Sequence, residues 1–241
     1  MSMLNSFFQS KNAGTQTKAM SSEFFAQVYT YMFIALGISS GLAYICGTPE
    51  FFKTYFISAT GGLSPLFYVV AFAPVGLGLL IQMAYTKLSL TTLFLLFGVY
   101  AALMGVSLST IFLVYSISSI FTTFIVSAGA FAGMAILGYT TKTDLTKFGS
   151  LLYMVFIGIF IAGIVNIFLK SDSMSFMIAV LGVFVFTGLT AYQMQQLKYI
   201  SEDPSLSGVD KKKLSLIGGL MLYILFINLF LSILRLLGNR E

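Results

Sequence analysis

The sequence contains no histidine, no tryptophan, a single cysteine and few charged residues. Without histidine the chain cannot build a histidine metal site, a histidine proton relay or a histidine-based pH switch. The single cysteine, Cys46, cannot form an intramolecular disulfide or a multi-cysteine metal site. A Ser-His-Asp triad, a metal cluster and a phosphate-binding glycine loop are all missing. We therefore expect a protein that is not an enzyme and has no cofactor.

Charged residues make up only 9% of the chain, whereas hydrophobic residues make up 58%. A soluble domain normally carries about 25% charged residues, and so few charges could not cover the surface of a water-soluble fold. The mean hydropathy of +0.94 indicates an integral membrane protein. The net charge of +5 indicates cytoplasmic loops rather than a nucleic-acid partner, because Lys and Arg gather on the cytoplasmic side of membrane proteins.

The chain does contain a series of apolar segments that are long enough to cross a bilayer, which takes about 20 residues. The region Leu88–Gly138 carries no charge, so we place the break between two spans in the polar stretch VYSISSIF, Val114–Phe121. An arrangement of six spans with one re-entrant piece is the alternative. The seven predicted spans are Gln27–Gly47, Ser64–Tyr85, Ser89–Tyr115, Ile117–Gly138, Gly149–Leu169, Met174–Leu197 and Leu214–Leu237.

The spans divide the chain into a polar cytoplasmic tail over residues 1–26, one membrane domain over residues 27–237 and a short C-terminal tail over residues 238–241. Nine basic residues fall in the tail and loops on the N-terminal side, and four fall on the other side. The positive-inside rule then predicts the N-terminus inside and the C-terminus outside the cell. We expect an all-α integral membrane protein with seven transmembrane helices.

Two GxxxG patterns lie inside predicted spans, GISSG over Gly37–Gly41 and GAFAG over Gly129–Gly133. Glycine allows two helix backbones to approach closely, and helix association in lipid depends on such packing. We predict close packing within one molecule at both patterns, and we favour a monomer over a dimer.

Polar side chains inside the spans are amides and hydroxyls, and no carboxylate falls at the predicted middle of a span. The stretch FTGLTAYQMQQLK, Phe186–Lys198, brings three glutamines to a span end. We interpret Gln195 and Gln196 as an interfacial helix end whose amides reach water or headgroups. Asn166 and Asn228 are interpreted as hydrogen-bonding groups between helices, with a role in a water-filled path as the alternative.

Three stretches in order resemble the Bax inhibitor-1 family, also called the transmembrane BAX inhibitor motif family, and in particular its bacterial branch. They are GYTTKTDLTKFGSLL (Gly138–Leu152), FTGLTAYQMQQLK and LYILFINLFLSILRLLG (Leu222–Gly238). The resemblance covers nearly everything after the N-terminal tail. It implies six helices around a central one, a place in the cell inner membrane and a pH-sensitive calcium leak.

The resemblance also implies a pH sensor made of two aspartates, one on the sixth and one on the seventh span. Two close carboxylates resist double ionisation, so one of them holds a proton near neutral pH. This sequence has Gln193 and Leu225 at the two matching positions. Because neither residue titrates, we expect a weak or pH-insensitive cation leak. The motif tyrosines Tyr192 and Tyr223 either close the path by packing or belong to the helix core. Gln193, Asn166 and Asn228 would line the path.

Two other functions stay open at this point. Some bacterial members of the family are thought to bind a membrane-embedded AAA protease, so the protein is alternatively a regulatory interaction partner with its polar tail as a handle. A transporter of a small neutral solute would follow if Asn166, Gln193 and Asn228 shared a cavity. The expected partners are thus the lipid bilayer, calcium ions and such a protease.

Overall fold

The structure, a computed structural model, describes the backbone of residues 2–239 and the side chains of residues 21–239. Within these residues seven helical segments are long and apolar enough to cross a membrane, which confirms the predicted number: Ser21–Cys46, Pro65–Ala84, Leu90–Leu113, Ile117–Thr140, Thr146–Leu169, Asp172–Glu202 and Gly208–Leu237. The alternative with six spans and a re-entrant piece is wrong, because the charge-free region forms two separate spans.

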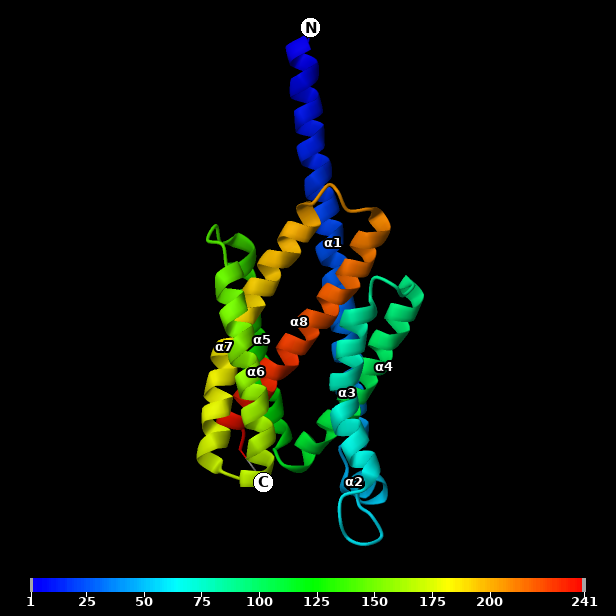
Figure 1. Cartoon of the computed structure of the whole chain (residues 1–241), viewed down its shortest axis with the longest axis vertical. Helices are drawn as coiled ribbons and strands as arrows, with labels where there is room; N and C mark the ends of the chain where they lie inside the picture. The colour runs from blue at the N-terminus through cyan, green and yellow to red at the C-terminus, as the bar shows by residue number, and fades with distance from the viewer. Residues whose placement is uncertain (1, 240–241) are drawn as a thin grey trace.

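The helices follow one another with short connections (Figure 1). They are α1 (Ser2–Cys46), α2 (Pro49–Phe56), α3 (Pro65–Ala84), α4 (Leu90–Leu108), the 3-10 helix η1 (Ser109–Leu113), α5 (Ile117–Thr140), α6 (Thr146–Leu169), α7 (Asp172–Glu202) and α8 (Gly208–Leu237). The short helix α2 was not predicted. The first helix joins the predicted tail to the first span without a break, and its N-terminal part projects beyond the bundle in Figure 1.

Serine hydroxyls mark where most spans begin. At Ser116 the side chain accepts a hydrogen bond from the backbone N–H of Ser119 (3.3 Å), so the VYSISSIF stretch starts α5 as a conventional N-cap. The same arrangement begins α3, α4, α7 and α8 at Ser64, Ser89, Ser171 and Ser207. Polar residues thus set the helix starts even where the region carries no charge.

Helix α8 is the central helix that the family resemblance implied. In Figure 1 it runs obliquely between one group made of α1, α3 and α4 and another made of α5, α6 and α7. It packs against α1, α4, α5 and α7, while α3 packs on α4 and α6 packs on α7. Its apolar window is 72% buried, whereas that of α6 is 0% buried. The molecule therefore has a helix core wrapped by helices whose outer faces suit lipid.

The glycines of both GxxxG patterns face away from the neighbouring helices. A Cβ added at any glycine of Gly37–Gly41 or Gly129–Gly133 would have no neighbour within 4 Å. The prediction that these glycines mediate close packing is therefore wrong, because they are exposed, although Ser39 within GISSG is buried. Close approach occurs instead at Gly138, where a Cβ would overlap the backbone of Ala191, and at Gly105, where it would overlap Ser39.

Candidate functional site

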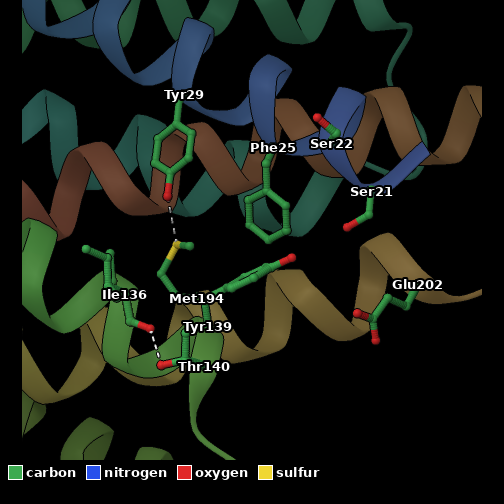
Figure 2. Close-up of a pocket in the computed structure, with 10 residues that line it drawn as sticks. Ser21, Ser22, Phe25, Tyr29, Ile136, Tyr139, Thr140, Met194 and Glu202 are labelled. Atoms are coloured by element: carbon green, nitrogen blue, oxygen red, sulfur yellow. Dashed lines mark hydrogen bonds between the residues drawn. The ribbon is translucent and has the colours of Figure 1, made fainter. Parts of the chain in front are cut away.

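Two cavities enter the helix bundle from opposite ends. The C-terminal cavity, about 800 Å³, lies between α3, α6, α7 and α8, near the end of α8. The N-terminal cavity, about 740 Å³, lies between α1, α5 and α7 (Figure 2). The polar residues of the C-terminal cavity are Asn166, Asp172, Ser175, Asn228, Ser232 and Arg235. Its bulky apolar residues include Phe72, Val75, Phe156, Phe160, Ile164 and Phe186.

Asn166 uses its amide to hold the turn between α6 and α7. Its Nδ2 donates to Ser175 Oγ (2.7 Å), and its Oδ1 accepts from the backbone N–H of Ser171 (3.1 Å). The turn contains Lys170 in the left-handed region, with φ of 49°, a conformation that costs energy for a residue other than glycine. The amide therefore stabilises the end of the cavity wall.

Asn228 lines the same cavity from α8, but its amide bonds within its own helix. Its Nδ2 donates to the backbone carbonyl of Ile224 (2.8 Å), and its backbone carbonyl accepts from Ser232 Oγ (2.7 Å). Within the described side chains its Oδ1 has no hydrogen-bond partner, and the predicted bond to a neighbouring helix is not made. An acceptor oxygen is therefore free at the inner part of the C-terminal cavity.

The N-terminal cavity has aromatic walls and a methionine at its base (Figure 2). Tyr29 points across the cavity, and its hydroxyl donates to the sulfur of Met194 (3.7 Å). The rings of Phe25 and Tyr139 meet edge to face at 5.2 Å between centroids. The carboxylate of Glu202 lies at the rim, in the last turn of α7.

The two cavities lie at different levels along α7. On α7, Phe186 lines the C-terminal cavity and Met194 lines the N-terminal cavity. The step between them corresponds to about 12 Å along a helix axis at about 1.5 Å per residue. Leu189, Thr190 and Ala191 fill this interval and are buried, at 1%, 0% and 3% exposure. We call this interval the seal.

Leu225 stands in the seal on the α8 side. Gly182 contacts Ser232 and Gly218 contacts Leu197, so these antiparallel helices place residue 225 level with about residue 189 or 190 of α7. The Leu225 side chain is only 7% exposed. The position at which the resemblance implied a sensor aspartate is therefore buried and apolar.

Gln193 lies about one helical turn from the level of Leu225, toward the N-terminal cavity. Its side chain is half-buried and lines neither cavity. No hydrogen bond of its amide occurs among the described side chains. The two predicted sensor positions thus belong to helices that pack together, but the structure does not place them at one level.

The two motif tyrosines pack away from the cavities. Tyr192 lies against Gly149 of α6 and meets the ring of Tyr153 edge to face, at 6.1 Å between centroids. Tyr223 is fully buried, with its ring edge to face against those of Phe97 and Tyr100 at 6.2 and 6.0 Å. Both positions are packing positions between helices, and neither lines a cavity.

Gln195 is the polar residue that the sequence analysis misjudged. It is 1% exposed, so the interpretation as an interfacial helix end is wrong for this residue. Its Nε2 donates to the backbone carbonyl of Thr143 (2.8 Å), and its Oε1 accepts from the backbone N–H of Leu145 (2.8 Å). One buried amide therefore fastens the loop between α5 and α6 to α7.

The same loop carries Asp144, whose carboxylate accepts a hydrogen bond from the backbone N–H of Thr146 (2.9 Å). Interactions with the hydroxyl and the backbone N–H of Thr146 hold the pKa of Asp144 below its usual range. A carboxyl group with a lowered pKa stays ionised throughout neutral pH. Asp144 therefore supplies no titration between about pH 6 and pH 8.

Comparison with known proteins agrees with this architecture. The family model described as inhibitor of apoptosis-promoting Bax1 matches residues 21–241. The inner membrane protein YbhL of Escherichia coli (strain K12) is 38% identical over 236 residues, which cover 97% of this chain and 99% of YbhL. A protein of Borreliella burgdorferi is 42% identical over 223 residues, and they cover 91% of this chain and 93% of that protein.

A protein of Caulobacter vibrioides is 41% identical over 227 residues, which cover 91% of this chain and 90% of that protein. These relatives match nearly from end to end. The resemblance found in the three sequence motifs is therefore confirmed, and this multi-pass membrane protein belongs to the Bax inhibitor-1 family.

Proposed function

We propose that the protein is a cation-permeation scaffold of the calcium-leak type, closed in this conformation and weakly responsive to pH. One observation carries the proposal: two cavities enter from opposite ends of the bundle, and both are lined by α7, at levels about 12 Å apart along that helix. Rearrangement of the packed residues between these levels would join the cavities into a continuous path. Such a path would run along α7, which contributes residues to both cavities.

The charge at the N-terminal rim supports permeation by a cation. Glu202 is the charged residue that lines the N-terminal cavity, whereas Asp172 shares the lining of the C-terminal cavity with Arg235. Hard cations such as Ca²⁺ prefer oxygen ligands, and a charged entrance raises the local concentration of its counter-ion. The seal between them contains no carboxylate, so a divalent ion would cross it slowly because a charge in an apolar layer is costly.

The proposal for pH follows from the two replaced positions. Gln193 is an amide and Leu225 is an alkane side chain, and neither gains or loses a proton near neutral pH. A leak through this chain should therefore change little between about pH 6 and pH 8.

Calcium flux into proteoliposomes tests this proposal, with the parent protein beside a Gln193→Asp plus Leu225→Asp variant at about pH 6 and pH 8. We expect a weak leak with little pH response from the parent, and a pH response from the double variant. Gln196→Asp is the matched control, because it adds a carboxylate to the same helix outside the motif position. A strong pH response of the parent would overturn the assignment of Gln193 and Leu225.

A regulatory role toward a membrane-embedded AAA protease is the second candidate. The continuous helix α1 favours it, since its N-terminal part projects beyond the bundle in Figure 1 and offers a surface to a cytoplasmic partner. If neither the parent nor the double variant conducted calcium, the regulatory role would be favoured over the calcium leak. A transporter of a neutral solute has less support, because Asn166 and Asn228 share a cavity but Gln193 does not line it.

A further inference from the structure

The C-terminal cavity is as deep as one leaflet of a bilayer. On α6 its lining residues run from Phe156 to Ile167, which corresponds to about 16 Å at about 1.5 Å per residue. The hydrocarbon core of a bilayer is about 30 Å thick, so each leaflet contributes about 15 Å. The cavity therefore extends from the edge of the membrane to about its middle.

The cavity also opens toward the hydrocarbon. Its walls α3 and α6 pack on different partners, α4 and α7. Three apolar side chains on these walls line the cavity and yet remain exposed, Phe72 at 53%, Phe160 at 43% and Ile164 at 38%. A lipid chain can reach these side chains directly from the bilayer, whereas a water-soluble molecule would have to enter at the rim.

The rim of the cavity carries two opposite charges. Asp172 lies in the first turn of α7 and Arg235 in the last turn of α8, and both side chains are exposed. Among the described side chains neither takes part in an ion pair or a hydrogen bond. Each charge suits the dipole of its own helix end, but that alone does not explain why both line one cavity.

We propose that this cavity binds a phospholipid whose zwitterionic headgroup carries a primary ammonium, as in phosphatidylethanolamine. The Arg235 guanidinium binds the phosphate, since a planar fork of N–H donors matches phosphate oxygens. The Asp172 carboxylate accepts hydrogen bonds from the ammonium. One acyl chain lies against Phe72, Phe160 and Ile164, in the apolar part of the cavity.

The chemistry of the rim distinguishes among phospholipids. A choline headgroup has a positive charge but no N–H to donate to Asp172. A glycerol headgroup has no positive charge, so the carboxylate would repel the anionic lipid. The amide of Asn166 is already engaged with Ser171 and Ser175, so the recognition of the headgroup falls to Asp172 and Arg235.

Native mass spectrometry of the delipidated full-length protein tests the headgroup. Phosphatidylethanolamine, phosphatidylcholine and phosphatidylglycerol of equal chain length are titrated, and we expect the first to bind most tightly. Asp172→Asn should weaken the binding of phosphatidylethanolamine about tenfold and remove the preference for this lipid over phosphatidylcholine. Arg235→Gln should weaken the binding of all three lipids. Glu50→Gln and Lys53→Gln on α2 are the matched controls, because both side chains are exposed and neither lines the cavity.

A second pair of variants tests the acyl chain. Gly163 lines the cavity and Gly158 does not, and a Cβ added at either glycine of α6 meets no neighbour within 4 Å. Gly163→Phe should fill the apolar part of the cavity and weaken the binding of phosphatidylethanolamine at least tenfold. Gly158→Phe should leave this binding unchanged. Both substitutions point into open space, so the fold is retained.

Three results would overturn the proposal. Equal binding of the three lipids would mean that the cavity holds ordinary surrounding lipid without headgroup recognition. If Asp172→Asn and Glu50→Gln changed lipid binding equally, the rim of the cavity would not recognise the headgroup. Displacement of the lipid by glycerophosphoethanolamine or a free amino acid at similar concentration would assign the cavity to a soluble zwitterion instead. Because the readout is bound lipid, none of these results depends on whether the protein conducts calcium.

Discussion

At Gln195 one side chain joins two segments that are 50 residues apart in the sequence. Gln195→Leu keeps most of the side-chain volume but leaves the Thr143 carbonyl and the Leu145 N–H without their partner. A lost partner of a buried polar group costs about 1–3 kcal/mol, so we expect the free energy of unfolding to fall by about that amount. Thermal unfolding in detergent measures the loss.

Gln196→Leu is the control for this prediction. Its side chain is half-buried and makes no hydrogen bond among the described side chains, so the change should stay within about 0.5 kcal/mol. Hydrogen exchange at residues 141–146 should rise in Gln195→Leu and stay unchanged in Gln196→Leu. Equal unfolding temperatures for the two variants would show that the amide does not hold the loop.

The contrast between Gln195 and its neighbours also shows why the sequence did not predict this contact. The periodicity of a helix separates one face from another, and Gln193 and Gln196 share a face on which Gln195 does not lie. It does not say which face meets another part of the chain. The partners at Thr143 and Leu145 belong to a distant loop, and their backbone groups carry no signal in the residue types.

Among the elements, apolar length and the polar break at VYSISSIF predicted nearly all of the spans. The structure extends the sixth span from Asp172 to Glu202, because polar helix ends lie outside the apolar stretch. Helix α2 was missed because its 8 residues are too few to form a span. The GxxxG prediction failed since a glycine pattern shows where close approach is allowed, and the neighbouring helices decide where it occurs.

Close approach of α5 and α7 at Gly138 gives the prediction at the scale of elements. An added Cβ there would overlap the backbone of Ala191, which lies in the seal. Gly138→Leu should push the two helices apart and lower the free energy of unfolding by about 1–3 kcal/mol, as overpacked cores do. The unfolding temperature in detergent measures the change, and calcium flux of the same variant reports whether the seal loosens.

Gly133→Leu, on the same helix, is the matched control. A Cβ at Gly133 has no neighbour within 4 Å, and leucine favours a helix over glycine by about 0.8 kcal/mol. The control should therefore unfold at the same or a higher temperature. A loss of stability in Gly133→Leu as large as that in Gly138→Leu would mean that the exposed glycines pack against a second molecule in the membrane.

For the whole molecule, the arrangement of helices puts the two termini at opposite ends of the bundle (Figure 1). The basic residues predict which end faces the cytoplasm. Lys211, Lys212 and Lys213 start α8 at the same end as the projecting part of α1, and the opposite loops carry few cations. Anionic lipids of the cytoplasmic leaflet attract such a cluster by about 1 kcal/mol per basic residue.

Labelling of single cysteines tests this orientation in a Cys46→Ser background, which removes the only native thiol. Thr60 lies in the loop between α2 and α3, Ser205 lies in the loop between α7 and α8, and both are exposed. A membrane-impermeant maleimide should label Thr60→Cys in intact cells but label Ser205→Cys only after the membrane is opened. The reverse pattern would invert the molecule and place the phospholipid cavity in the inner leaflet, because that cavity lies at the same end of the bundle as the C-terminus.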